Sequence, residues 1–203
     1  MKMSDKGLTE LVGHEGICTS KYLDSVGVWT IGIGATKSEL PVMPNSITIP
    51  QAFELLRTGI VKYEDALNRA LIHPVKQTQF DALCSWCYNV GTGWVRKATI
   101  VKRINAGDTG QDLYDALMMF DIPKEIIPRR RKEALLLRDG IYSNKGEALL
   151  FPVNTKHYPV YSKGTTINVW EYLPAKETPV LPIEVAASGV IQRVKDYFWG
   201  TKS

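Results

Sequence analysis

One short segment of this chain has strand-like composition, and helical periodicity marks the sequence around it. Residues 18–35 set β-branched and aromatic residues between closely spaced turn residues, among them Gly27, Gly32 and Gly34. This pattern predicts a small sheet of short, twisted strands joined by tight turns. Before it, apolar residues at helical spacing predict a short first helix from Ser4 to Gly13, with a break near Glu15.

A series of helices is predicted after the segment. A loop at 37–46 precedes a helix that begins with a capping box of Thr48 and Gln51 and continues towards Leu71, with a bend at Gly59. Apolar residues at i, i+3, i+4, i+7 and i+8 then predict a buried helical stripe, formed by Phe80, Leu83, Cys84, Cys87 and Tyr88.

Three shorter helices complete the first 140 residues. They are predicted at 94–105, at 108–120 and at 129–138, the last ending at Gly140. The second is expected to open with a capping pair of Asp108 and Gln111.

Charge and cysteine content narrow the functional classes only slightly. The formal net charge of +4 favours an acidic polymer, which includes both peptidoglycan and nucleic acid. Three cysteines are too few for a disulfide framework or a four-ligand zinc site, so reduced thiols are expected. The Cys84-to-Cys87 spacing lies within the helical stripe, so core packing is favoured over a redox motif.

Two further features bear on location and partner. The sequence has no apolar run of 18 residues and no signal-peptide hydrophobic region near its start, so synthesis in the cytoplasm is expected. The basic run 129–132 lacks interleaved aromatic residues. A solvated or salt-bridged helix face is therefore favoured over nucleic-acid binding, and we expect no nucleic-acid partner.

Glu15, Asp24 and Thr30 form the densest chemical signal. Hydrolysis of a glycosidic bond needs one protonated carboxyl group for the leaving oxygen and one carboxylate that positions water. Glu15 is expected where the first helix meets the sheet, half covered by apolar neighbours such as Trp29 or Ile31. Asp24 is expected in a polar turn, with the Thr30 hydroxyl holding the attacking water. The spacing alone favours an exposed Glu at a helix end and a solvated Asp in a turn.

This stretch resembles the active-site signature of the glycoside hydrolase family 24 lysozymes, the T-even phage lysozyme and lambdoid endolysin group. Glu15, Asp24 and Thr30 match it without a gap. Residues 79–83, 88–93 and 104–108 are similar to the family's central helices, and 129–133 to its paired-arginine segment. The sequence departs from the family at Ala35, where many relatives have His, and at Phe120, which replaces a Trp.

The resemblance implies a two-lobed α+β lysozyme fold with a small N-terminal β-sheet lobe and a larger helical lobe. It implies cleavage of the β-1,4 bond between N-acetylmuramic acid and N-acetylglucosamine in peptidoglycan, with Glu15 as acid, Asp24 and Thr30 handling the water, and an inverting displacement. It also implies a saccharide-binding role for Tyr88, Asn89 and Thr99, and no metal or organic cofactor. The expected protein is a phage endolysin, acting as a monomer and reaching the periplasm or cell wall after release.

The chain is divided into a lysozyme-like catalytic domain, 1–140, and a C-terminal extension, 141–203, whose role the sequence leaves open. Within the extension, 151–174 resembles irregular strands and 174–182 a linker. A final amphipathic helix is predicted from Ala187, Val190, Ile191, Val194 and Phe198. Packing against the catalytic domain is the default expectation. Cell-wall binding, attachment to a virion and membrane contact by the final helix are the alternatives.

Other functions remain open beside the endolysin. A virion-associated lysozyme used when the phage enters its host would employ the extension for attachment. A lytic transglycosylase would form an anhydro-sugar and would not need Asp24 and Thr30 to position water. A non-catalytic peptidoglycan-binding protein could keep the same fold, but the intact set of Glu15, Asp24 and Thr30 argues against it.

Overall fold

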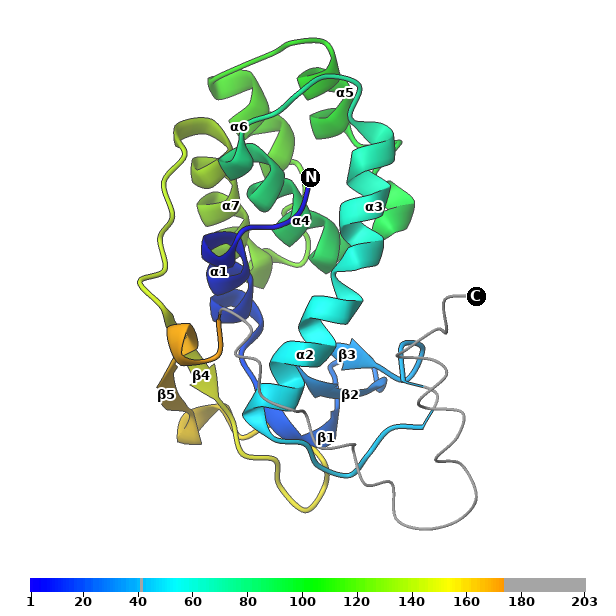
Figure 1. Cartoon of the computed structure of the whole chain (residues 1–203), viewed down its shortest axis with the longest axis vertical. Coiled ribbons are helices and arrows are strands. Elements are labelled where there is room, and N and C mark those ends of the chain that lie inside the picture. The colour runs from blue at the N-terminus through cyan, green and yellow to red at the C-terminus, as the bar shows by residue number, and fades with distance from the viewer. Residues whose placement is uncertain (41, 174–203) are drawn as a thin grey trace, which may run out of the picture.

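The computed structural model describes residues 1–40 and 42–173, which form two lobes (Figure 1). The small lobe holds an antiparallel sheet of β1 (Cys18–Leu23), β2 (Trp29–Gly32) and β3 (Ala35–Thr36), in that order. The larger lobe is helical and contains α4 (Gln77–Val90), α5 (Thr99–Asn105), α6 (Gln111–Met118) and α7 (Ile127–Asp139). The predicted α+β architecture is confirmed.

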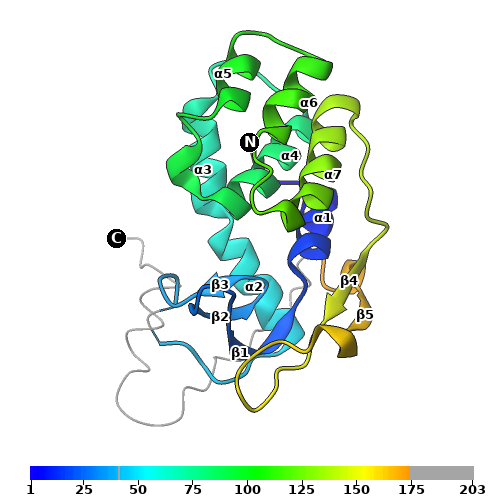
Figure 2. The same ribbon diagram turned by 180° about the vertical axis from the view of Figure 1, so that it is seen from behind.

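Helices also connect the two lobes. In both views α1 (Asp5–Glu15) leads from the helical lobe to the sheet, and α2 (Ile49–Gly59) and α3 (Val61–Ala70) lead back (Figures 1 and 2). The predicted capping box of α2 is present, because Thr48 and Gln51 exchange hydrogen bonds of 2.8 and 3.3 Å. The bend expected at Gly59 is a break between two helices.

Helix α4 forms the centre of the helical lobe. It packs against α1, α3 and α7, and its predicted stripe is buried, with Tyr88 half-buried. Burial of this stripe contributes to the hydrophobic stabilisation of the lobe. It also fixes the position of Ser85 and Asn89, which face the site described below.

The structure corrects two predicted helix starts. The helix expected at 94–105 begins only at Thr99, after a 3-10 turn, η1 (Thr92–Trp94). The Asp108–Gln111 capping pair is wrong, because Gly110 occupies the N-cap of α6 and Asp108 pairs with Arg103 at 3.1 Å. Helix α7 follows a second 3-10 turn, η2 (Lys124–Ile126), and ends at left-handed Gly140 as predicted.

The described part of the extension packs against the residues before it, as expected. Strands β4 (Glu147–Leu150) and β5 (Thr165–Asn168) form an antiparallel hairpin beside α1, with 3-10 turns η3 (Tyr161–Lys163) and η4 (Val169–Glu171) (Figure 1). Its residues Ala148, Val169 and Leu173 are buried in the shared hydrophobic core. The predicted linker at 174–182 and the helix through Ala187 and Phe198 lie outside the described residues.

None of the helices within residues 1–40 and 42–173 combines the length and the apolar character that a transmembrane span needs.

Candidate active site

Glu15 is the last residue of α1, at the point where the chain turns towards the sheet. The start of the helix is fixed by Ser4, whose hydroxyl accepts a 3.1 Å bond from the Gly7 N–H and whose N–H donates to Asp81 of α4 at 2.9 Å. Its end is fixed by Gly16 at φ 68°. The Glu15 side chain is 22% exposed. Glu15 therefore lies at the junction of the two lobes, as predicted.

Asp24 occupies the turn that joins β1 to β2. Its Oδ1 atom accepts hydrogen bonds from the backbone N–H groups of Val26, at 3.0 Å, and Val28, at 2.8 Å. Gly27 completes the turn at φ 81°. Since both bonds use Oδ1, the second oxygen is left for water or substrate.

Thr30 lies on β2, where it pairs with Tyr22 of β1. The residue is 3% exposed, and its hydroxyl donates to the Val28 carbonyl at 3.1 Å. With its proton committed in this way, the hydroxyl oxygen can still accept a hydrogen bond from a water molecule.

Arg129 of α7 contacts Glu15 directly, across the lobe junction. Its Nη1 atom lies 2.6 Å from Glu15 Oε1, its Nε 2.9 Å from Glu133 Oε1, and its Nη2 donates to the Ser85 carbonyl at 3.0 Å. Burial alone would lower the pKa of Arg129, but the Glu15 and Glu133 carboxylates outweigh it and raise the pKa, so the guanidinium stays charged. Apolar neighbours were expected around Glu15. The structure also places a nearly buried cation, Arg129, against its carboxyl group.

The neighbouring Arg130 belongs to the same network. It is 1% exposed, forms an ion pair with Glu133 and donates to Asn89 Oδ1 at 2.6 Å. Arg131 and Lys132 are exposed. The prediction of a solvated or salt-bridged helix face is thus confirmed, with the first two arginines paired and the next two residues in solvent.

Tyr22 lies near both carboxyl groups, and the sequence analysis did not single it out. Burial raises the pKa of its phenol above the usual range, and the charges of Glu15 and Asp24 raise it further. Its strand position, two residues before Asp24, is the signal that could have identified it. Trp29 instead makes an edge contact with His157, with ring centroids 5.1 Å apart, and lies under the ammonium group of Lys21.

The three residues predicted to bind saccharide have different surroundings. Tyr88 is held by a 2.6 Å bond from its hydroxyl to the Ile33 carbonyl, which links α4 to the sheet lobe. Burial raises the pKa of Tyr88 well above its usual value. Asn89 accepts the bond from Arg130. Thr99 is half-buried at the start of α5 and makes no side-chain hydrogen bond within the described residues.

His14, Cys84 and Cys87 do not contact Glu15, Asp24 or Thr30 through a side-chain hydrogen bond within the described residues. Burial, helped by Arg129, lowers the pKa of His14 to about 4, so its imidazole is neutral at pH 7. Cys84 and Cys87 are fully buried free thiols, and burial raises the pKa of Cys87 to about 12. Core packing is therefore confirmed over the redox interpretation.

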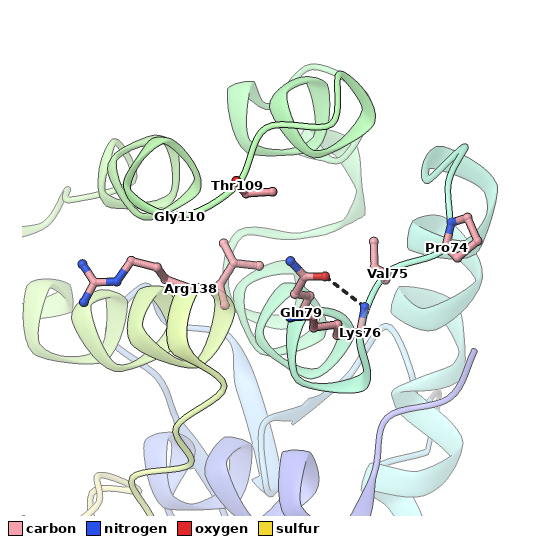
Figure 3. A pocket seen from close by; sticks show the side chains of 8 residues that line it. Pro74, Val75, Lys76, Gln79, Thr109, Gly110 and Arg138 are labelled. Atoms are coloured by element: carbon pink, nitrogen blue, oxygen red, sulfur yellow. Dashed lines mark hydrogen bonds between the residues drawn. The ribbon is translucent and has the colours of Figure 1, made fainter.

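A surface hollow elsewhere in the helical lobe does not contain the catalytic candidates. Figure 3 shows it between α4, α6 and α7, lined by Gln79, Thr109, Leu137 and Arg138 among others. Arg138 lies near the end of α7 opposite to Arg129. Glu15, Asp24, Thr30 and Arg129 are not among the residues that line the hollow.

The chain is similar to several known proteins. Residues 12–133 match the family described as phage lysozyme. The chain is 32% identical to the endolysin of Salmonella phage P22, over 67% of this chain and 97% of that protein. It is 30% identical to the endolysin of Bacillus phage PZA, over 80% of this chain and 65% of that one.

Solved structures give the same result. The fold superimposes on an endolysin from Escherichia coli O157:H7 phage FAHEc1 with a TM-score of 0.64 and 31% identity, covering 71% of this chain and 98% of that one. A P22 lysozyme variant gives a TM-score of 0.60 at 31% identity, covering 68% and 98% of the two chains.

Proposed function

The chain belongs to the phage lysozyme family and is a glycoside hydrolase of the endolysin type, and from this premise we propose that Glu15, Asp24 and Thr30 are its catalytic residues. Their substrate is the β-1,4 bond between N-acetylmuramic acid and N-acetylglucosamine in bacterial peptidoglycan. One observation carries the proposal: Glu15 and Asp24 lie at the two ends of β1, and Thr30 pairs with that strand at Tyr22.

Glu15 acts as the general acid. Arg129 holds Oε1 at 2.6 Å, which orients the carboxyl group and leaves Oε2 to carry the proton to the glycosidic oxygen. Departure of the protonated leaving group develops positive charge on the sugar ring. The acid is thus positioned by a contact from α7, while its backbone belongs to α1.

Asp24 and Thr30 handle the water. Oδ1 of Asp24 is held by the turn, so Oδ2 can accept a proton from water as that water attacks the anomeric carbon. The Thr30 hydroxyl oxygen accepts a hydrogen bond from the water's other O–H, which stays on the oxygen that becomes bonded to the sugar. Attack from the face opposite to the leaving group inverts the anomeric configuration, and it requires carboxyl groups about 6.5–9.5 Å apart.

Replacement of Glu15 by Gln tests the proposal, because the amide has nearly the same shape and cannot donate the proton. We expect near-complete loss of lytic activity with an unchanged far-UV circular dichroism spectrum. Substantial turnover by the variant would overturn the role of Glu15. The products of the wild-type enzyme test the reaction itself. Mass spectrometry distinguishes a hydrolysed reducing end from an anhydro-sugar, and NMR of the freshly formed product shows whether the anomeric configuration is inverted.

We further propose that the protein acts as a monomer that reaches the wall after release from the host cytoplasm. The location of its substrate, outside the cytoplasmic membrane, supports the need for release. Light scattering of the purified full chain tests the first statement, and fractionation of infected cells before and during lysis tests the second.

A further inference from the structure

The extension holds both ends of the strand that separates the two proposed carboxyl groups. Strand β1 is an edge strand of its sheet, so one row of its backbone groups faces away from β2. At its start, the Ile17 N–H donates to the Leu149 carbonyl and the Ile17 carbonyl accepts from the Phe151 N–H, each at 2.8 Å. At its end, the Leu23 N–H donates to the His157 carbonyl at 2.8 Å.

These contacts lie next to the proposed catalytic residues in the sequence. Ile17 is two residues after Glu15, and Leu23 directly precedes Asp24. In both views the segment that follows β4 runs alongside the outer edge of β1 (Figures 1 and 2). The middle of this edge is covered separately, by residues 45–47.

Phe151 fills the space beside the residue that follows Glu15. A Cβ atom at Gly16 would lie 2.6 Å from Phe151 Cε2, so the ring packs directly on the glycine backbone. Tyr161 supports the ring from its edge, with centroids 5.1 Å apart. The turn between α1 and β1 is therefore closed by a side chain of the extension.

The tip of the extension, residues 153–159, is a closed hairpin. Asn154 accepts hydrogen bonds from the N–H groups of Lys156, at 2.9 Å, and Tyr158, at 3.0 Å. The His157 N–H donates to the Asn154 carbonyl at 2.9 Å, and His157 has a left-handed φ of 63°. This backbone conformation points the His157 carbonyl at Leu23.

The base of the extension is anchored to α1. Ser143 and the Asn144 N–H donate to the buried Glu10 carboxylate at 2.8 and 2.6 Å, and the Asn144 amide donates to the Thr9 carbonyl at 2.8 Å. The extension is therefore attached to the residues before position 141 at three places: at its base, at Ile17 and at Leu23. Because it is held at all three, it can restrict movement of β1.

We infer that residues 147–160 are a positioning element that fixes the relative placement of Glu15 and Asp24 by holding the outer edge of β1. The inference rests on the proposed function, since it concerns the geometry of those two carboxyl groups. Displacement of a catalytic group by about 1 Å can cost on the order of a hundredfold in rate. Loss of the tip contact should therefore lower kcat, while KM changes little.

A matched pair of variants at His157 tests the inference in the full chain. His157→Gly keeps the left-handed backbone, whereas His157→Pro cannot adopt φ 63°, because the proline ring fixes φ near −65°. Both remove the imidazole, so they differ only in the backbone of the tip: the Pro variant loses the N–H that donates to the Asn154 carbonyl and turns the carbonyl away from Leu23. On soluble glycan strands, we expect kcat of the Pro variant to fall about tenfold or more and that of the Gly variant to stay within about twofold of wild type.

Hydrogen exchange provides a readout independent of activity: the Leu23 amide should exchange faster in the Pro variant than in the Gly variant. Equal kcat values for the two folded variants would overturn the inference, as would a change confined to KM, which would indicate direct contact of the loop with glycan. If the Pro variant does not fold, Asn154→Ala against Asn154→Asp repeats the comparison, because only Asp retains the acceptor that closes the tip.

Inclusion of Glu15→Gln in the same assay separates the two proposals. An active Glu15→Gln protein contradicts the proposed function, whatever the His157 variants do. An inactive Glu15→Gln protein, together with indistinguishable His157 variants, contradicts the positioning role alone.

Discussion

Nη1 of Arg129 lies 2.6 Å from Oε1 of Glu15, and the same guanidinium binds Glu133 and the Ser85 carbonyl. Three elements, α1, α4 and α7, thus meet at one side chain. The planar guanidinium suits this role because it presents several donors in fixed directions. A contact of this kind ties the orientation of the proposed acid to the packing of the helical lobe.

Replacement of Arg129 by Lys should separate charge from geometry. Lysine keeps the positive charge but cannot reach Glu15, Glu133 and Ser85 with one ammonium group, so we expect kcat to fall about 10–100-fold. Arg131→Lys on the exposed face of α7 is the matched control and should behave like wild type. Steady-state kinetics on soluble glycan strands measures both, and full activity of the Arg129 variant would contradict the orienting role.

The Thr30 hydroxyl is the subject of a second prediction. Thr30→Val keeps the shape of this nearly buried side chain but removes the oxygen that accepts from water, whereas Thr30→Ser keeps that oxygen. We expect the Val variant to lose about 10²–10⁴ in kcat and the Ser variant to retain activity within about tenfold. Parallel losses in the two variants would indicate a packing role for Thr30 and no role in holding water.

A third prediction concerns the stability of the turn after Glu15. Gly16→Ala introduces a Cβ at φ 68°, 2.6 Å from the Phe151 ring, and we expect it to lower the free energy of unfolding by about 2–4 kcal/mol. Gly27→Ala is the comparison, because its φ of 81° is also positive but no atom lies within 4 Å of the added Cβ. It should cost about 1 kcal/mol. Equal losses in urea unfolding would show that Phe151 does not restrict the turn.

The sequence predicts the elements of this fold better than their exact ends. Strong local signals, such as the Thr48 capping box and the apolar stripe of α4, are confirmed because they depend on neighbours within one or two turns. The Asp108 cap is wrong because a charge partner, Arg103, and a left-handed Gly110 decide the local geometry. Competition of this kind between partners is settled only by the tertiary structure.

The candidate site also has a part that could be predicted from the sequence and a part that could not. Glu15, Asp24 and Thr30 lie within one continuous stretch, and the resemblance of that stretch to the family signature identifies them as candidates. The contact of Arg129 with Glu15 joins residues 114 positions apart, and the contacts of His157 and Phe151 with β1 come from the extension. Long-range pairings of this kind leave no periodic pattern, which is why the extension's place beside the site could not be predicted.

The fourth prediction follows from the lowered pKa of His14, about 4 against an ordinary 6.5. As pH falls below about 6.5, the unfolded chain binds a proton at this residue while the folded protein does not, so stability is lost between pH 6.5 and about 4 and no further below it. The shift corresponds to up to about 3 kcal/mol. His14→Gln removes this titration and should therefore lose less stability than wild type when the pH is lowered from 7 to 4. Urea unfolding of both proteins at the two pH values measures the difference. The same pH dependence in both would mean that His14 is solvated in the folded protein and that Arg129 does not oppose its protonation.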